Sequence, residues 1–504
     1  MGAFQGISAR TVAGFACQQG FLYSLFYSGS NRALEAGGFS FERVDLLLTF
    51  VFLVAAFVLV GAASSRARNA LLAPTLVGWY AVLLVIGSLL VVLPIDAGLA
   101  EIAAEGALVG LPSGFLLCGW GRTLISVPIH CGAREILLAT AIGAAASLAV
   151  AAVPVPGASQ ILCFTPIGSA VALRSLADNA PRNAVGKPQP AQTAEGAADG
   201  FGAPLSIQSL LAAPAERAAT SRLTPNVAAG TALFGLSGGL MEVFSSEPGM
   251  PANPAFPATL LILALFCVAA LQFYTGSTQR VQAGRAEGSL TGVYRIAILL
   301  IMAGCLFVTV LDGFGITGQS ITLGGYLGLT CVLMTLLLTI GRASGRDGAS
   351  TFARGLASLF AGEIAGIAAG NALELAQPYA AQPVAFVAFA GLASLFAYLF
   401  LFTENDYGEL AAIADGIDLF DEACRRIAEE HALSKRETEV LPMALRGRTS
   451  ERIAEELCIA KSTADTHLRR IYAKTGVHSR QELIDLSERM QAELSGNSAS
   501  RSAR

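Results

Sequence analysis

Residues 433–486 read LSKRETEVLPMALRGRTSERIAEELCIAKSTADTHLRRIYAKTGVHSRQELIDL and predict four short helices around a small core. At three of the helix starts a side chain can accept a hydrogen bond from an unpaired backbone N–H group. These starts are marked by Ser434 with Glu437, by Thr449 or Ser450 after Gly447, and by Ser479 with Glu482. The first and last pairs have the spacing of a capping box, in which serine and glutamate each satisfy one N–H.

The helix predicted to begin near Lys461 is amphipathic. Ala464, Leu468 and Ile471 recur at i, i+4 and i+7, which gives it one apolar face. Its opposite face is polar and partly basic, with Asp465, Thr466, Arg469 and Arg470. A small helical core that presents such a face is what a DNA-binding helix-turn-helix requires.

The same residues resemble the LuxR/NarL-type DNA-binding domain. The family pattern is Leu-Ser-x-Arg-Glu-x-Glu-Val-Leu, a glycine, Ile-Ala-x-x-Leu, and a Thr-x-x-x-His-Leu helix that ends Ile-Tyr-x-Lys. The residues that match in register are Leu433, Ser434, Arg436, Glu437, Glu439, Val440, Leu441, Gly447, Ile453, Ala454, Leu457, Thr463, His467, Leu468, Ile471, Tyr472, Lys474, Val477, Ser479 and Arg480. The resemblance implies a four-helix domain that binds double-stranded DNA.

The resemblance also assigns roles to individual residues. It implies that the helix beginning near Lys461 enters the major groove. The side chains implied to face the bases are those of Asp465, Thr466 and Arg469. The side chains implied to face phosphate are those of Thr463, Arg470 and Lys474. The helix after Ser479 is implied to form the contact of a homodimer on DNA.

Some residues depart from the family pattern. Pro442 removes one backbone hydrogen bond inside the first helix. Ala460 stands where the family has a Ser or Thr cap, and Asp465 stands where many members have Lys or Arg. Asp465 could accept a hydrogen bond from cytosine N4 or could complement the helix dipole, and both interpretations remain open. Because acids such as Glu455 offset most of the basic charge, we expect weak binding by a monomer.

The rest of the chain has the composition of a membrane protein. Charged residues make up 14% and hydrophobic residues 54%, and the mean hydropathy is +0.59. A soluble domain averages about 25% charged residues. Apolar stretches long enough to cross a bilayer are predicted at residues 8–28, 44–63, 70–93, 99–121, 133–153, 157–177, 224–246, 256–275, 291–311, 318–341, 353–376 and 384–402. The predicted fold is all-α, a bundle of about twelve spans followed by the small helix-turn-helix domain.

The arginines predict the orientation of the bundle. A DNA-binding domain must face the cytoplasm, and twelve spans then place the N-terminus there as well. With that orientation the inner loops hold Arg66, Arg68, Arg122, Arg134, Arg174, Arg182, Lys187, Arg217, Arg222, Arg280, Arg285, Arg342, Arg346 and Arg354, whereas the outer loops hold Arg32 and Arg43. This agrees with the positive-inside rule. We therefore expect a multi-pass protein of the cytoplasmic membrane, and the absence of a cleavage site argues against a removed signal peptide.

Two membrane halves are separated by a segment without helical periodicity. The predicted segments are membrane half one (1–177), a flexible cytoplasmic linker (178–223), membrane half two (224–402), a cytoplasmic linker helix (403–431), the helix-turn-helix domain (432–490) and a disordered tail (491–504). Six spans on each side resemble the major facilitator superfamily. The loop at residues 62–68 lacks the aspartate of that family's Gly-x-x-x-Asp-Arg signature, which argues against transport.

Polar residues inside the spans are candidates for binding a ligand or coupling it to the rest of the chain. They are Gln18, Gln19, Glu105, Glu363, Asn371 and Glu374. An ionisable group at this depth is costly, so it usually faces the bundle interior and has a role. The alternative, that these groups only pair with one another, remains open. Ser358, Gly362, Gly366 and Gly370 step by four and predict close helix packing.

No enzymatic centre, cofactor site or metal site is predicted. The nine cysteines include no Cys-x-x-Cys pair and the four histidines are scattered, with Cys458 expected to be buried in the helix-turn-helix core. Residues 403–418 are predicted to be extended, and Asp418–Glu430 to form an amphipathic helix leading into the DNA-binding domain. The predicted function is a one-component transcription regulator in which a small molecule bound by the membrane domain controls DNA binding. The alternatives are a transporter with an appended regulatory domain, and a membrane anchor that binds a protein partner and has no ligand of its own.

Overall fold

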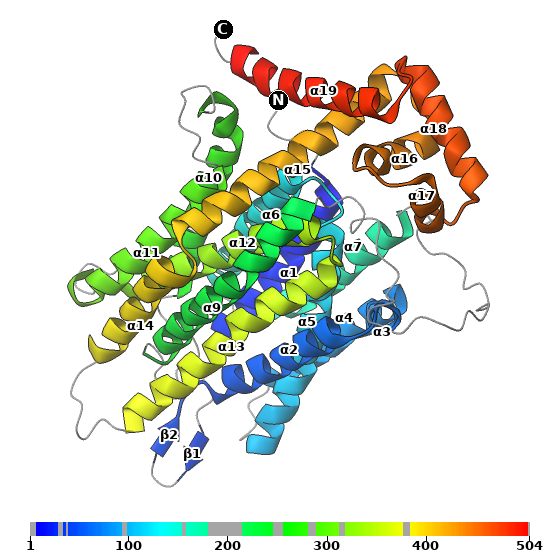
Figure 1. The fold of residues 1–504 in the computed structure, drawn as a ribbon. Coiled ribbons are helices and arrows are strands. Elements are labelled where there is room, and N and C mark those ends of the chain that lie inside the picture. The colour runs from blue at the N-terminus through cyan, green and yellow to red at the C-terminus, as the bar shows by residue number, and fades with distance from the viewer. Residues whose placement is uncertain are drawn as a thin grey trace, which may run out of the picture.

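The computed structural model describes residues 7–28, 34–36, 39–92, 98–153, 158–179, 214–244, 256–280, 289–311, 318–375 and 384–501. Its long helices run side by side as one bundle, and a smaller group of helices lies at one end of this bundle (Figure 1). At the opposite end β1 (Leu34–Ala36) pairs antiparallel with β2 (Phe39–Phe41). The predicted all-α fold, a membrane bundle with a small C-terminal domain, is confirmed.

The helices of the bundle follow the predicted order. The first half contains α1 (Ala9–Ser28), α2 (Val44–Ala62), α3 (Ser65–Leu71), α4 (Pro74–Val92), α5 (Leu99–Leu124), α6 (Ile129–Ala151), the 3-10 segment η2 (Ala158–Phe164) and α7 (Thr165–Asn179). The second half contains α9 (Pro214–Phe244), α10 (Phe256–Arg280), α11 (Ser289–Leu311), α12 (Gly318–Ser344), α13 (Gly348–Leu375), α14 (Val384–Phe396) and the π-helical segment η6 (Ala397–Leu401). Because α9 begins at Pro214, the part of the predicted linker from residue 214 onward is helical.

The predicted count of twelve spans is not confirmed. Among the described helices, eight are long and apolar enough to cross a bilayer, or ten if each of two bent pairs is one span. The two bent pairs are α3 with α4 and the α14–η6 segment with the helix that follows it. The first helix carries Gln18 and Gln19, and the sixth predicted span is divided between η2 and α7. Both features reduce the length or the hydropathy of a continuous helix.

The predicted glycine stripe brings α13 against α9. A Cβ atom added to Gly366 would overlap the carbonyl oxygen of Leu236 and lie 2.9 Å from Cα of Gly239. A Cβ atom on Gly370 would lie 2.8 Å from Cβ of Val243, and the Ser358 hydroxyl donates to the Ala228 carbonyl at 2.7 Å. Only residues without a large side chain permit this approach of two helix backbones. The prediction of close packing along this stripe is confirmed.

A carboxylate joins the two halves at the end of the bundle that carries the small domain. Asp347, between α12 and α13, accepts hydrogen bonds from Arg68 Nη1 at 3.1 Å and from Arg122 Nη2 at 3.0 Å. Arg68 also donates to the carbonyls of Val60 (3.1 Å) and Ala63 (2.8 Å) at the end of α2. Arg68 and Arg122 therefore hold the first half to the first turn of α13.

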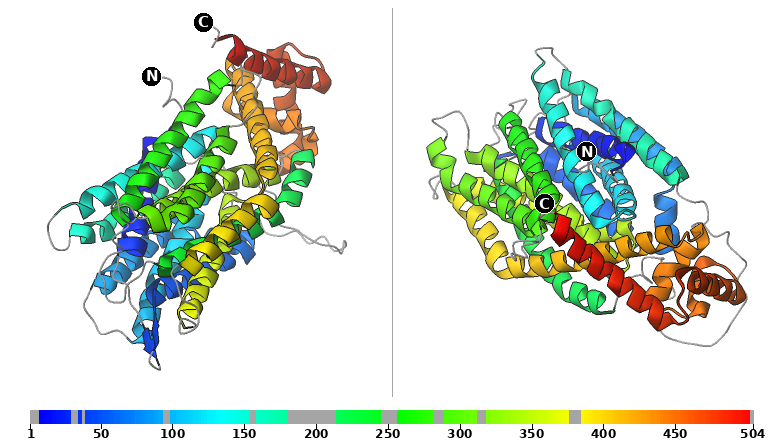
Figure 2. Two further views of the ribbon diagram at one scale, coloured as in Figure 1. Left: turned by 90° about the vertical axis from the view of Figure 1, so that its left-hand side faces the viewer. Right: turned by 90° about the horizontal axis from the view of Figure 1, so that it is seen from above.

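A single helix, α15 (Glu404–Glu430), connects the bundle to the small domain. The prediction that residues 403–418 are extended is wrong, because Thr403 and Asp406 form a capping box that starts the helix there. Its first half contributes Tyr407, Leu410, Ala411, Ala414 and Ile417 to the core of the bundle. Seen from above, α15 lies across the end of the bundle (Figure 2).

The small domain has a core of its own, to which the second half of α15 contributes. Its helices are α16 (Lys435–Leu445), α17 (Ser450–Leu457), α18 (Lys461–Thr475) and α19 (Arg480–Arg501). The α15 side chains in this core are Phe420, Ala423, Cys424 and Ile427. The tail predicted to be disordered from residue 491 is helical as far as Arg501, and Met490 and Leu494 of α19 pack on the same core.

Candidate nucleic-acid interface and its connection to the bundle

Side-chain caps set the helix boundaries of the small domain. Ser434 accepts from the Glu437 N–H and the Glu437 carboxylate accepts from the Ser434 N–H, which confirms the first predicted capping box. Thr449 caps α17 by accepting from Arg452 N at 3.3 Å. The turn between these two helices passes through Gly447, whose φ of +78° is a conformation that favours glycine.

Two predictions at the later helix ends differ from the structure. Ser479 accepts from Glu482 N at 3.2 Å, but the Glu482 carboxylate accepts from His478 N at 2.8 Å rather than from Ser479 N. Cys458, expected in the core, is exposed because it ends α17 in a left-handed conformation with φ of 51°. A residue in this conformation ends the helix and turns its side chain away from the packed face.

The outer face of α18 has the pattern required for reading DNA. Ala464, Leu468 and Ile471 are buried against the neighbouring helices, as predicted. Exposed residues of α18 include Thr463, Thr466, Arg469 and Arg470, and Asp465 is half-buried. Among the described residues Arg469 and Arg470 make no ion pair. Both guanidinium groups are thus available to an external partner.

Lys474, predicted to contact phosphate, is engaged inside the small domain. Its Nζ donates to the carboxylate of Glu437 at 2.7 Å and to the carbonyl of Ala432 at 3.0 Å. Burial alone would raise the pKa of the Glu437 carboxyl, but hydrogen bonds from Lys474 and Ser434 outweigh it and lower the pKa to about 2. A contact between Lys474 and phosphate would require Lys474 to leave this buried carboxylate.

Helix α19, predicted to form a dimer contact, turns its apolar side toward α15. Leu483 and Met490 are 0% and 6% exposed, and they share a core with Phe420 and Ile427 of α15. The exposed residues of α19 are mostly polar or charged and include Gln481, Glu482, Asp485, Glu488, Arg489 and Glu493. In this structure the apolar side of α19 is therefore packed against α15 and α16.

Two aspartates one turn apart tie α15 to different halves of the bundle. Asp418 accepts the backbone N–H groups of Ile129 and His130 at 2.8 Å each, and thereby caps α6 of the first half. Asp421 pairs with Arg342 at the end of α12, in the second half. Cation–π contact between Arg446 and the Phe420 ring, 4.1 Å to the centroid, adds a link from α15 to α16. The hydrophobic face of Asp418–Glu430 was visible in the sequence, but these polar contacts were not.

The candidate polar residues of the bundle lie in separate places. Gln18 accepts from Ser169 of α7 at 3.1 Å, whereas Gln19 donates to Thr140 of α6 at 3.2 Å. Glu105 is 7% exposed in α5, where it precedes the glycines that pack on α2. The side chain of Glu374 lies outside the described residues. The candidates whose side chains the structure describes thus do not converge on one site.

Glu363 and Asn371 of α13 have different surroundings although they share a helix face. Asn371 accepts from Glu42 N at 2.7 Å and donates to Glu42 O at 3.1 Å, so its amide holds the chain at the start of α2. Glu363 is 1% exposed, and its Oε2 has no hydrogen-bond partner among the described residues. Its titratable neighbours include Tyr326 of α12 and Glu242 of α9. Among the candidates whose side chains are described, Glu363 is an ionisable group that is buried and has a carboxylate oxygen without a hydrogen-bond partner.

A buried ion pair near Glu363 was not predicted from the sequence. Arg43, which we expected in an outer loop, stands just before α2 and lies 3.4 Å from the Glu242 carboxylate, with side chains 5% and 3% exposed. The backbone of Arg43 is left-handed, with φ of 56°. The position of a polar residue near the end of a predicted span does not indicate how deep its side chain lies in the bundle. Arg43 and Glu242 are far apart in the sequence, and only the folded chain brings them together.

Comparison with known proteins agrees with the geometry of the small domain. Residues 431–487 match the family of bacterial regulatory proteins, luxR family. The HTH-type transcriptional regulator MalT of Yersinia pestis (strain Pestoides F) is 40% identical over 58 residues, which cover 12% of this chain and 6% of that protein. These residues therefore form a LuxR-type helix-turn-helix DNA-binding domain, and this chain matches only a small part of the curated relative.

The whole chain was also compared with solved structures. The crystal structure of an auto-inhibited POT family peptide transporter covers 80% of this chain and 96% of its own length, with a TM-score of 0.46 and 12% identity. The major facilitator superfamily transporter FucP, in the outward conformation, covers 80% of this chain and 98% of its own length, with a TM-score of 0.41 and 13% identity.

Proposed function

We propose that this protein is a one-component transcription regulator embedded in the cytoplasmic membrane, with both termini in the cytoplasm. A small molecule bound by the helical bundle biases one of two packings of its halves, and α15 transmits this difference to the DNA-binding domain. The observation that carries the proposal is that α15 contributes to the core of the bundle with one half and to the core of the DNA-binding domain with the other. Because α15 is one rigid helix, a shift of its first half in the core of the bundle also displaces its second half in the core of the DNA-binding domain.

The contacts of α15 supply a mechanism for the transmission. Asp418 holds α15 to α6 and Asp421 holds it to α12, so both contacts survive only while these helices keep their relative position. A ligand that favours a packing with α6 and α12 further apart would break at least one of them. Such a ligand acts only through its different affinities for the two packings.

DNA binding in this proposal is controlled through dimerisation. Helix α18 packs on α16 and α17, and the outward side chains that would read or hold DNA, except the half-buried Asp465, remain exposed while the domain rests on the bundle. Asp465, Thr466 and Arg469 would contact bases, and Thr463, Arg470 and Lys474 would contact phosphates. The apolar face of α19 is covered by α15. Release of α15 would uncover the part of this face on which α15 packs, and a second copy could then pack there to form the homodimer.

Among the buried polar groups, Glu363 is the proposed point at which the ligand acts. It lies where α13 packs closely on α9, since a Cβ atom on Gly235 of α9 would stand 3.0 Å from Glu363 N. A charge change there would alter the packing of two helices of the second half. Gln18, Gln19, Glu105, Asn371 and Glu374 are proposed to couple this change to neighbouring helices rather than to bind the ligand together.

Chromatin immunoprecipitation of the tagged full chain from the membrane fraction tests the proposed function. Wild-type protein should enrich a small set of promoters, and Arg469→Ala should accumulate in the membrane without enriching them. The genes next to those promoters would then indicate the class of ligand. No enrichment of promoters by the wild type would contradict the role in transcription, whereas equal enrichment by wild type and Arg469→Ala would remove only Arg469 from the reading face.

A further inference from the structure

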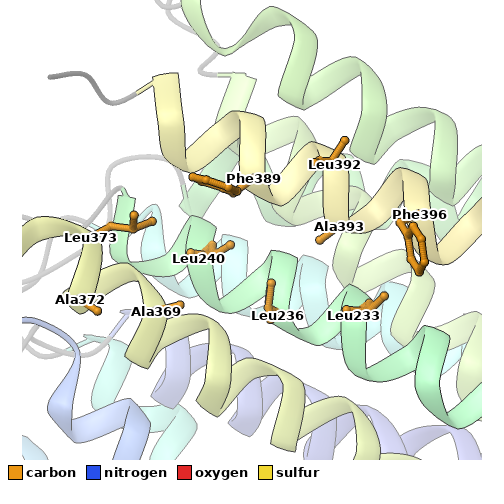
Figure 3. A pocket seen from close by; sticks show the side chains of 10 residues that line it. All are labelled: Leu233, Leu236, Leu240, Ala369, Ala372, Leu373, Phe389, Leu392, Ala393 and Phe396. Carbon is orange, nitrogen blue, oxygen red and sulfur yellow. The ribbon is translucent and has the colours of Figure 1, made fainter. Parts of the chain in front are cut away.

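An apolar groove runs along the outside of the second half of the bundle (Figure 3). Its volume is about 640 Å³, within the roughly 300–1,000 Å³ of small-molecule sites. Helix α14 forms one side, α13 forms the other, and α9 lies between them. The lining residues are Leu233, Leu236, Leu240, Ala369, Ala372, Leu373, Phe389, Leu392, Ala393 and Phe396.

The lining of the groove selects for hydrocarbon. None of its ten side chains carries a nitrogen, oxygen or sulfur atom. The nearby serines of α9 and α14 are used elsewhere, because Ser394 donates to Ser237 at 2.8 Å and Ser237 donates to the Ala390 carbonyl at 2.9 Å. A polar ligand would lose its hydration here and gain no hydrogen bond from the lining side chains. A saturated hydrocarbon chain has no hydrogen bonds to water that it would lose on entering the groove.

The groove is connected to α15 through the end of α14. Phe396 is the last residue of α14 and its ring packs on Phe400 of η6, with ring centroids 4.9 Å apart. The chain then reaches Phe402, whose carbonyl accepts from the Tyr294 hydroxyl at 2.6 Å. The Tyr294 ring stacks on Tyr407 of α15 at 4.9 Å. A π-helical segment such as η6 often accompanies a functional site in helical proteins.

We propose that this groove binds one acyl chain of a membrane lipid and that the bound chain sets the position of α14 and thereby of α15. The exposed side chains of Phe389, Leu392 and Phe396 border the groove, so in a bilayer its opening faces lipid tails. Because the lining offers nothing to a headgroup, the acyl chain is the part that is bound. The binding of an acyl chain in the groove does not depend on the proposed function, whereas an effect of this chain on DNA binding rests on the proposed function.

Photo-cross-linking of the full chain in lipid nanodiscs tests the proposal. The probe is phosphatidylcholine with a diazirine on one acyl chain, and cross-linked peptides are quantified by mass spectrometry. Ala393→Trp places an indole ring in the groove, and Ala388→Trp is the matched control because Ala388 is exposed on α14 outside the lining. If Ala393→Trp does not accumulate, Ala369→Trp fills the groove from α13.

Cross-links in the wild type should concentrate on the groove segments of α9, α13 and α14. The groove-filling variant should lower this labelling by roughly tenfold, because the indole replaces the contacts of several methylene groups, and Ala388→Trp should leave it unchanged. Even labelling of all lipid-facing helices, or unchanged labelling in the filled variant, would overturn the proposal. DNA binding measured on the wild-type samples separates the two ideas. If labelling is concentrated on the groove but the wild type binds no promoter DNA, only the proposed function is rejected; if the wild type binds promoter DNA but its labelling is even over all lipid-facing helices, only the groove is rejected.

Discussion

The carboxylate of Asp418 lies 2.9 Å from Nδ1 of His130, across 288 positions of the chain. The same carboxylate accepts the first backbone N–H groups of α6, where a helix favours negative charge. Three residues later Asp421 pairs with Arg342, which also donates to the carbonyl of Val127 at 3.0 Å. One turn of α15 thus contacts both halves of the bundle where they approach each other. This arrangement makes the position of α15 sensitive to how the two halves are packed.

Arg469→Ala is expected to weaken binding of the full chain to its promoter DNA by about 1–3 kcal/mol per half-site, the cost of one lost bidentate base contact. Arg469 is exposed on α18, so the substitution should leave membrane insertion and folding intact. Arg489→Ala is the matched control, because Arg489 is exposed on the charged side of α19. Titration by fluorescence anisotropy measures both. Equal affinity of the two variants would remove Arg469 from the reading face.

Glu363→Gln is expected to abolish the transcriptional response to inducer while the protein still accumulates in the membrane. The change preserves size and most hydrogen bonding but removes the ionisable proton from a side chain that is 1% exposed. A reporter dose–response curve with quantified membrane protein provides the measurement. A normal dose–response would mean that Glu363 only fills space between α9 and α13.

Gly366→Ala is expected to lower the stability of the bundle by about 1–3 kcal/mol, the usual cost of overpacking. Its Cβ would overlap the carbonyl oxygen of Leu236 in α9. Gly408→Ala is the opposite case, because a Cβ there meets nothing within 4 Å and Gly408 lies inside α15. That change should stabilise by about 0.5–1 kcal/mol. Thermal unfolding in detergent should separate the two, and equal midpoints would contradict the packing argument.

The sequence predicts those features that depend on local pattern. The helices of the DNA-binding domain follow from caps such as Ser434 and from the stripe Ala464–Leu468–Ile471, and both lie where expected. Close packing through Gly366 also follows from local spacing. The start of α15 was missed because its composition is acidic, although Thr403 and Asp406 have capping-box spacing.

Contacts between distant segments could not be predicted in this way. Nothing in the neighbourhood of Asp418 indicates that it caps α6, and nothing near Glu242 indicates that Arg43 is its partner. Asp347 did carry one signal, since it is an acid among the basic residues of the loop that contains Arg346. The groove on α9 depends on how far α14 stands from α13, which is a property of the folded bundle.

Acid is expected to loosen the DNA-binding domain through Glu437. Its pKa is 4.5 in an unconstrained chain and about 2 in the fold, so its contribution to stability is complete above about pH 4.5 and is lost as the pH falls toward 2. Glu437→Gln should lose a charged hydrogen bond worth about 1.5–3 kcal/mol together with this part of the pH dependence. Protection factors from hydrogen exchange of residues 435–445 measure both effects.

Glu439→Gln is the control for this prediction, because Glu439 is only half-buried in its pair with Arg436. It should retain the acid sensitivity of the wild type. A parallel loss of protection with falling pH in wild type and Glu437→Gln would assign the acid sensitivity to other groups.

The most direct measurement is the DNA affinity of the full chain in nanodiscs when both aspartate contacts of α15 are removed. Asp418→Ala with Asp421→Ala should release α15 from α6 and α12, uncover α19 and raise both the dimer fraction and the affinity for promoter DNA without inducer. Glu430→Ala, an exposed acid near the end of the same helix, should change neither. An unchanged affinity and dimer fraction in the double variant, with the protein folded in the membrane, would contradict the account of α15 as the coupling element.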